Sequence, residues 1–158
     1  MKLNHAIVTT PPRPAATVML LRDGANGLEV FMVRRHGESD VLGGAYVFPG
    51  GKVDADDAHP DLLARVGVPV ERLHAELGEP ELPAATAASM YVAALRETFE
   101  EAGLLLGAGP RPVDAERARA LARDGLSFAE ILARMDTGLA VARMVPWSRW
   151  ITPVIPSV

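Results

Sequence analysis

The stretch from residue 84 to residue 102 constrains the fold most, because apolar residues recur along it at helical spacing. Pro83 suits the first turn of a helix, and Gly103 is a typical C-terminal cap. The pattern therefore predicts one long helix over 83–102 that buries a single stripe in the core. The residues of this stripe are Ala84, Ala88, Tyr91, Leu95, Phe99 and Ala102.

Three glutamates near the end of this helix break local rules of helix design. Glu97, Glu100 and Glu101 stand at positions i, i+3 and i+4, so their carboxylates share one side and repel one another. They also lie near the negative end of the helix dipole, which favours cations. Such conflicts are typical of functional sites, and a bound divalent cation would remove this one. A solvated charged face is the alternative, and for an isolated Glu-Glu-x-Gly it is the commoner case.

The composition excludes several kinds of site. The chain has 158 residues, which is the size of one domain, and no cysteine, so disulfides, thiolate metal sites and cysteine nucleophiles are excluded. Its net charge of −4 gives no electrostatic footprint for nucleic acid or an anionic membrane, although local arginines can still hold a phosphorylated substrate. There is no signal-peptide pattern and no apolar run of membrane-spanning length, so we expect a cytoplasmic protein.

The first part of the chain has the pattern of short strands. Apolar, β-branched runs at 17–22 and 28–35 flank a glycine-rich segment, which predicts a β-hairpin. The second run ends in Arg34-Arg35, which is either a solvated strand end or a pair of guanidinium groups suited to phosphate.

A further short strand is expected over 45–48, and the paired glycines Gly50 and Gly51 follow it. Glycines at such a place form a tight turn, which the residues alone favour, or they let the backbone approach another group closely.

Prolines and glycines punctuate the next segment, which we interpret as a surface insertion at about 58–83 that forms a lid or a pocket wall. Two short helices are expected in it, near 61–66 and 70–77. No second ligand stands at metal spacing from His59 or His74, so we expect both side chains to be solvated.

The segment after the long helix predicts a buried strand over 104–106 and two helices, over 114–123 and 127–135. Ser127 and Glu130 have the spacing of a capping box at the start of the second helix. We expect Trp147 and Trp150 to lie in the core rather than to form a platform for substrate.

Gly51 and the run Arg96-Glu97-Thr98-Phe99-Glu100-Glu101-Ala102-Gly103-Leu104 together resemble the Nudix box. That signature reads Gly, five residues, Glu, seven residues, then Arg-Glu-apolar-x-Glu-Glu-x-Gly-apolar. Thr98 replaces the aliphatic residue, and Asp57 stands where the first glutamate is expected. Since 44 residues separate Gly51 from Arg96, against about thirteen in the standard signature, an insertion interrupts the box.

The expanded box and two flanking stretches, 42–54 and 147–153, resemble the coenzyme A and acyl-CoA diphosphatase branch of Nudix hydrolases. The resemblance covers about 15–153 and implies an α/β (α+β) Nudix fold in a single domain over 1–158, with a mixed β-sheet sandwiched between helices. Members of the branch continue with further strands and a closing helix. We therefore expect this chain, which stops at Val158, to lack its C-terminal strands and helix.

The resemblance also implies a reaction, the metal-dependent hydrolysis of a diphosphate linkage in a nucleoside-diphosphate derivative. The substrate of the branch is CoA or acyl-CoA, and the products are 3′,5′-ADP and (acyl-)phosphopantetheine. The alternatives are a Nudix pyrophosphatase that acts on ADP-ribose, a nucleotide sugar or a nucleoside triphosphate, and a module that binds a nucleotide without hydrolysing it. The expected partner is thus a small molecule, not nucleic acid or a membrane, and a homodimer is left open.

By the same resemblance, Glu97, Glu100 and Glu101 are ligands of Mg²⁺ or Mn²⁺, with help from the carbonyl of Gly50. Glu97 serves either as a ligand or as the general base, and Arg96 holds a glutamate in position by a charge-assisted hydrogen bond. On residues alone, Arg96 would instead form an ordinary i,i+4 surface pair with Glu100. The expected catalytic residues are Glu97, Arg96 and Glu100, and the expected substrate-binding residues are Arg34, Arg35, Gly50 and Gly51.

Overall fold

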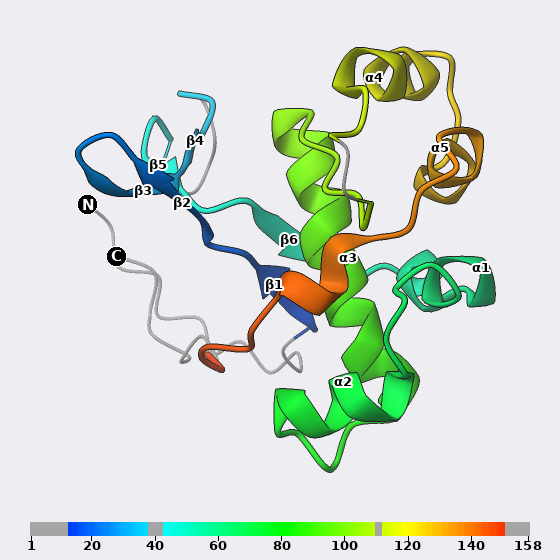
Figure 1. Cartoon of the computed structure of the whole chain (residues 1–158). Coiled ribbons are helices and arrows are strands. Elements are labelled where there is room, and N and C mark those ends of the chain that lie inside the picture. The colour runs from blue at the N-terminus through cyan, green and yellow to red at the C-terminus, as the bar shows by residue number, and fades with distance from the viewer. Residues whose placement is uncertain (1–12, 38–42, 110–111, 151–158) are drawn as a thin grey trace, which may run out of the picture.

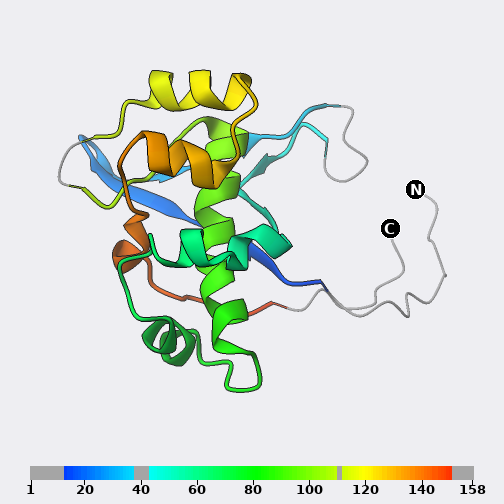
Figure 2. The same cartoon turned by 90° about the vertical axis from the view of Figure 1, so that its right-hand side faces the viewer.

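The computed structural model describes residues 13–37, 43–109 and 112–150, and its central element is the helix α3 (Ala84–Ala102). Strands lie on one side of α3 and the helices α1, α4 and α5 on the other, as Figures 1 and 2 show from two directions. The helix is confirmed together with both of its predicted ends, since Pro83 precedes it and Gly103 follows in the left-handed conformation with φ 67°. Most of its residues are buried, so α3 carries the core on more than one face.

Three two-stranded antiparallel ladders make up the strands of the described residues, in the pairs β1–β6, β2–β3 and β4–β5. The predicted hairpin is confirmed as β2–β3, and its last pair is Gly24 opposite Gly27. The ladder β1–β6 packs against α3 and brings Gly50 and Gly51 to that helix. The strands are β1 (Ala15–Thr17), β2 (Leu20–Gly24), β3 (Gly27–Phe31), β4 (Val33–Arg34), β5 (Tyr46–Val47) and β6 (Gly50–Lys52).

The segment that follows β6 forms the 3₁₀ helix η1 (Ala55–Ala58) and the helices α1 (Pro60–Leu63) and α2 (Val70–Leu77). Both predicted helices are present, but the segment is not confined to the surface, because Leu62, Val66 and Leu73 are buried in the core. The hydroxyl of Tyr91 on α3 donates to the carbonyl of Leu73 at 3.3 Å. Residues that were expected to cover the surface therefore complete the core around α3.

The two histidines of this segment, both predicted to be solvated, differ in their surroundings. His59 is exposed, as predicted, and its Nδ1 accepts a hydrogen bond from the backbone of Asp61 at the start of α1. His74 is half-buried instead, with Nε2 at 3.0 Å from the carbonyl oxygen of Glu79.

The strand predicted over 104–106 is wrong. Leu105 is buried as expected, but next to this segment there is only a single β-bridge, between Gly107 and Leu139. Its two backbone bonds run from Ala140 to the carbonyl of Leu106 and from Ala108 to that of Gly138. A buried apolar run is compatible with strand or coil, and here its neighbour is the short 3₁₀ helix η2 (Ala140–Arg143) instead of another strand.

The helices α4 and α5, which lie with α1 on the side of α3 away from the strands (Figures 1 and 2), were both predicted. The helix α4 (Ala115–Arg123) begins after Asp114, whose side chain accepts from the backbone of Arg117. The helix α5 (Phe128–Arg134) begins with the predicted capping box of Ser127 and Glu130. No helix of the described residues is long and apolar enough to span a membrane.

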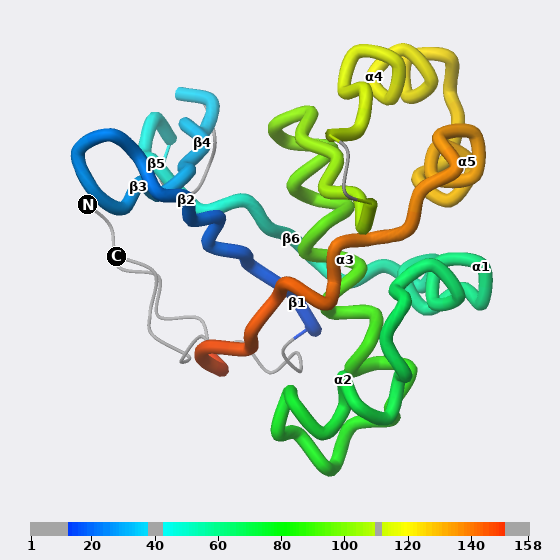
Figure 3. Tube along the Cα trace, viewed as in Figure 1, coloured from blue at the N-terminus to red at the C-terminus, as the bar shows by residue number. Residues whose placement is uncertain are grey.

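Both tryptophans lie outside the core, so the prediction of their burial is wrong. Trp147 is 82% exposed and Trp150 is 81% exposed. The chain that follows η2 forms no helix or strand up to residue 150, and Figure 3 traces its path. Arg149 pairs with Glu79, just after α2, at 3.0 Å, but both indole rings stay exposed. Residues 151–153, which end one stretch resembling the acyl-CoA diphosphatase branch, and Leu42, which begins the other, lie outside the described residues.

Candidate active site

The three glutamates lie on the last turns of α3, where the helix faces the ladder β1–β6. The side chain of Glu97 is largely enclosed, with 17% of its surface exposed, whereas that of Glu100 is half exposed. Glu101 is exposed. The N–H of Gly103 donates to the carbonyl of Phe99 at 2.7 Å and ends the helix beyond the cluster. A row of carboxylates at a helix end, as predicted, is therefore present.

Gly50 and Gly51 belong to the strand β6, so the tight turn that their sequence favoured is wrong. The N–H of Gly50 donates to Oε2 of Glu101 at 3.2 Å. A Cβ on Gly51 would lie only 2.3 Å from Cδ of Glu97, closer than any side chain could come. Gly51 is thus needed because the Glu97 carboxylate of α3 approaches the backbone of β6 closely, whereas a Cβ on Gly50 would meet Ala16 and Thr17 of β1.

Arg96 is the centre of the site, because its five N–H groups point at five acceptors. Nη1 donates to Glu97 at 3.1 Å and to Glu100 at 2.8 Å. Nη2 donates to the carbonyl of Lys52 on β6 at 2.9 Å. The residue is only 7% exposed, so the surface pair proposed from spacing alone is wrong. Arg96 instead ties the glutamates of α3 to the strand.

Asp57 was identified at the first glutamate position of the box but was not among the predicted site residues, and the structure adds it to the site. Its carboxylate is fully buried and receives two parallel bonds from Arg96, Nε to Oδ1 at 2.8 Å and Nη2 to Oδ2 at 3.0 Å. The backbone N–H of Asp54 also donates to Oδ2, at 2.8 Å. The signal was that five residues separate it from Gly51, which is where the Nudix box has a glutamate. Asp57, from the first half of the interrupted Nudix box, thus bonds directly to Arg96 in the second half.

The electrostatics of the site show an excess of negative charge. The hydrogen bond to Asp57 is the main reason that the pKa of Arg96 is raised, so the guanidinium stays charged. Burial raises the pKa of Glu100, and the charges of Glu97 and Asp54 raise it further. The ion pair with Arg96 acts in the opposite direction but does not reverse the shift. Because three carboxylates, those of Asp57, Glu97 and Glu100, bond to Arg96, its single positive charge compensates them only in part, which favours the binding of an additional cation.

The donor set fits a hard cation, because Glu97, Glu100 and Glu101 supply only oxygen. Each of the three carboxylates accepts a hydrogen bond through a single oxygen. Glu97 and Glu100 accept from Arg96, and Glu101 accepts from the backbone of Gly50. In the side-chain positions seen here, no three His, Cys, Asp or Glu residues of 13–37, 43–109 and 112–150 are grouped as ligands of a metal ion. The oxygen ligands thus fit Mg²⁺ or Mn²⁺, while in their present conformations the carboxylates bond to Arg96 and to the backbone of β6.

The two other predicted substrate ligands lie at the end of β4. Nε of Arg34 donates to the carbonyl of Gly44 at 3.3 Å, and the backbone of Arg35 donates to Ala45. Both side chains are exposed, and neither forms a hydrogen bond or ion pair with the glutamates of α3 within the described ranges. The structure therefore does not bring these arginines into direct contact with the cluster.

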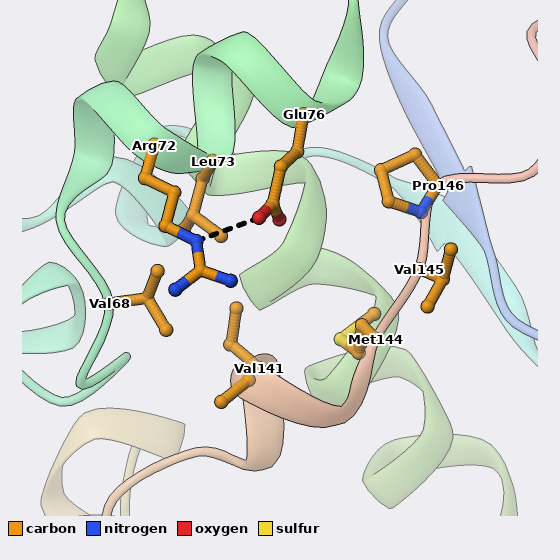
Figure 4. A pocket seen from close by; sticks show the side chains of 9 residues that line it. Val68, Arg72, Leu73, Glu76, Val141, Met144, Val145 and Pro146 are labelled. Carbon is orange, nitrogen blue, oxygen red and sulfur yellow. Dashed lines mark hydrogen bonds and ion pairs between the residues drawn. The ribbon is translucent and has the colours of Figure 1, made fainter.

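A cavity of about 340 Å³ lies between α2 and η2, away from the glutamates, and Figure 4 shows its lining. Arg72 and Glu76 of α2 form an ion pair of 2.7 Å at its edge. The helix α2, from the segment after β6, thus forms one wall of this cavity. The lining residues are Val68, Arg72, Leu73, Glu76, Val141, Ala142, Met144, Val145 and Pro146, none of which belongs to the predicted site.

Comparison with known proteins identifies relatives for the chain as a whole. No family model matches it. It is 28% identical to the acyl-coenzyme A diphosphatase NUDT19 of Gallus gallus over 191 aligned positions, which cover 90% of this chain and 50% of the relative. It is 30% identical to the NUDIX hydrolase from Alicyclobacillus acidocaldarius, whose crystal structure it matches with a TM-score of 0.61 over 85% of this chain and 59% of that one.

The chain thus spans about half the length of the curated relative and somewhat more of the solved structure. Both relatives are described as Nudix proteins, which agrees with the resemblance of Gly51 and the Arg96–Leu104 run to the Nudix box. The chain therefore has a Nudix hydrolase fold, and its sequence is similar to Nudix hydrolases, among them an acyl-coenzyme A diphosphatase.

Proposed function

We propose that this chain catalyses the metal-dependent hydrolysis of a diphosphate linkage, with CoA or acyl-CoA as the substrate. The products would be 3′,5′-ADP and phosphopantetheine or its acyl derivative. The observation that carries the proposal is the Arg96 network, which holds Glu97 and Glu100 beside β6 with a surplus of negative charge. The similarity to NUDT19 supports the choice of substrate.

The metal ligands in this proposal are Glu97, Glu100 and Glu101, with the carbonyl of Gly50 as a further oxygen donor. A bound Mg²⁺ or Mn²⁺ neutralises diphosphate charge and lowers the pKa of water. Arg96 is a positioning residue, because its bonds to Asp57 and to the Lys52 carbonyl hold the guanidinium still.

Glu97 has two candidate roles, metal ligand and general base. It is the most enclosed of the three carboxylates and lies against Gly51. A pH profile separates the roles: loss of the base removes the acidic limb of kcat, whereas loss of a ligand raises the metal concentration needed for activity.

Arg34 and Arg35 are proposed to bind phosphate oxygens of the substrate, together with the backbone of Gly50 and Gly51. The support for this is that both arginine side chains are exposed at the end of β4, and the only bond from the Arg34 side chain in the described structure is to the Gly44 carbonyl. A guanidinium group that is free to turn can meet two oxygens of a phosphate.

A screen of diphosphates tests the substrate class. CoA, acetyl-CoA, ADP-ribose, a nucleotide sugar and a nucleoside triphosphate are each incubated with the protein and Mg²⁺ or Mn²⁺, and products are identified by mass spectrometry. We expect CoA and acetyl-CoA to give 3′,5′-ADP, and EDTA to stop the reaction. Turnover of ADP-ribose without turnover of CoA would reject CoA as the substrate but would still support the proposed active site.

A second candidate is a nucleotide-binding module without hydrolysis. The observation in its favour is that the carboxylates of the described chain are not grouped as metal ligands in their present positions. Calorimetry with 3′,5′-ADP and no turnover of any diphosphate would support this module. For either function we propose a cytoplasmic location, and the choice between monomer and homodimer is measured by light scattering.

A further inference from the structure

A groove of about 370 Å³ lies between the C-terminal end of α3 and the helix α4, directly beside Glu100. Of the residues that line it, only Glu100 belongs to the proposed active site. The others bring two cations and an apolar wall to the edge of the glutamate cluster. The lining residues are Phe99, Glu100, Gly103, Arg119, Ala122 and Arg123.

Arg119 is fixed in the wall of this groove. Its Nη1 donates to the carbonyl of Gly103 at 3.4 Å, at the negative end of α3, and its Nη2 pairs with Glu116. A Cβ on Gly103 would lie 2.8 Å from Cδ of Arg119, so the side chain packs directly over the glycine. The guanidinium is therefore held in one place with N–H groups left over.

Arg123 differs, because it forms no hydrogen bond or ion pair with the part of the chain that the structure describes. It is exposed in the last turn of α4, one turn beyond Arg119 on the same helix face. The helix carries three arginines and a single glutamate, whereas the chain as a whole has a net charge of −4. The groove itself is lined by two arginines and one glutamate, a small positive surplus in an acidic protein, and this suits an anionic ligand.

We propose that this groove binds a phosphate monoester of the substrate that is distinct from the scissile diphosphate, with Arg119 and Arg123 as its ligands. The proposal rests on the proposed function, since Glu100 is shared by the groove and the diphosphate site. A phosphate monoester carries nearly two negative charges at neutral pH and three acceptor oxygens, which suits two guanidinium groups. In CoA the 3′-phosphate of the adenosine is such a group, and dephospho-CoA lacks it.

Hydrolysis of this matched pair of substrates tests the groove. We expect Arg123→Ala to lower kcat/KM for CoA by about 10-fold or more, mainly through KM, and to leave that for dephospho-CoA within about twofold. Arg117→Ala is the control, because it removes the same charge from the same helix at a residue that does not line the groove. An equal loss with both substrates, or no loss with CoA, overturns the proposal.

A binding measurement separates this proposal from the proposed function. If the chain hydrolyses neither substrate, the proposed function fails, but titration calorimetry with 3′,5′-ADP and with 5′-AMP still tests the groove. We expect wild type to bind 3′,5′-ADP about 10-fold more tightly than AMP, and Arg123→Ala to remove the difference. Equal affinities in wild type overturn the proposal, and so does inorganic phosphate that binds as tightly as 3′,5′-ADP.

Discussion

Asp57 and Arg96 are 39 positions apart in the chain and form a buried pair joined by two parallel hydrogen bonds, of 2.8 and 3.0 Å. The pair connects η1 to the middle of α3, and the same guanidinium reaches the adjacent Glu97 and, one turn further on, Glu100. The segment between them, with α1 and α2, therefore does not separate the two halves of the Nudix box in space. Asp57 fixes the guanidinium of Arg96 through Nε and Nη2, and Nη1 is then in place to bond to the carboxylates of Glu97 and Glu100.

The first prediction concerns this pair. Asp57→Asn should lower the free energy of unfolding by about 3 kcal/mol, because it removes the buried charge that faces Arg96. Urea unfolding monitored by circular dichroism measures the change.

The control is Asp56→Asn at the neighbouring position, which is exposed and should change stability by less than about 0.5 kcal/mol. If the two variants unfold at the same urea concentration, the buried pair has no special role in the fold.

Asp57 also shows how far sequence reasoning can go. The periodicity of 84–102 predicted α3, because an apolar stripe of that length has few other solutions. Counting from Gly51 found Asp57, but nothing local distinguishes it from its exposed neighbour Asp56, since only the fold decides which of the two meets Arg96.

Tertiary context also decided the two failures outside the site. Hydrophobicity predicted that Trp147 and Trp150 are buried, yet no element of the described chain packs over them. Apolar character alone cannot separate a buried strand from buried coil, and residues 104–106 are the latter.

The second prediction concerns the carboxylates. Glu100→Gln and Glu101→Gln should each lower the Mg²⁺-dependent kcat by about 100-fold or more, because even the groups that orient metal ligands contribute about 10-fold to 100-fold. Stability should change little, since both residues are exposed.

Steady-state kinetics at saturating Mg²⁺ measure this effect, and Glu71→Gln on the exposed side of α2 is the matched control. Wild-type rates in both Glu100→Gln and Glu101→Gln would mean that the cluster is only a solvated face.

The third prediction concerns the contact of β6 with α3. Gly51→Ala should lower kcat by about 100-fold, because the new methyl group would occupy the space of the Glu97 carboxylate and displace it. Gly109→Ala is the control, since a Cβ there meets nothing within 4 Å. Circular dichroism should show the Gly51→Ala variant folded, and full activity in it would show that the position of Glu97 is not critical.

The fourth prediction concerns pH and the capping box of α5. Both Ser127 groups, the hydroxyl and the backbone N–H, donate to Oε2 of Glu130 and lower its pKa. The pKa of Glu130 is lower in the folded state than in the unfolded state, where it is near 4.5. The ionised carboxylate therefore contributes its full stabilisation when the pH is above the unfolded pKa. This contribution is lost as the pH falls from there through the folded pKa.

Ser127→Ala should therefore destabilise the protein by about 1 kcal/mol at pH 7, through loss of the N-cap. The difference in stability between wild type and Ser127→Ala should shrink below the ordinary pKa of a glutamate. The reason is that a protonated Glu130 accepts a weaker hydrogen bond from the serine hydroxyl than the ionised carboxylate does. Thermal unfolding of both proteins across a pH series, without metal, measures this difference. A gap that stayed constant from pH 7 into the acid range would mean that the serine caps the helix only through the backbone of Glu130, where its hydroxyl oxygen accepts at 3.4 Å.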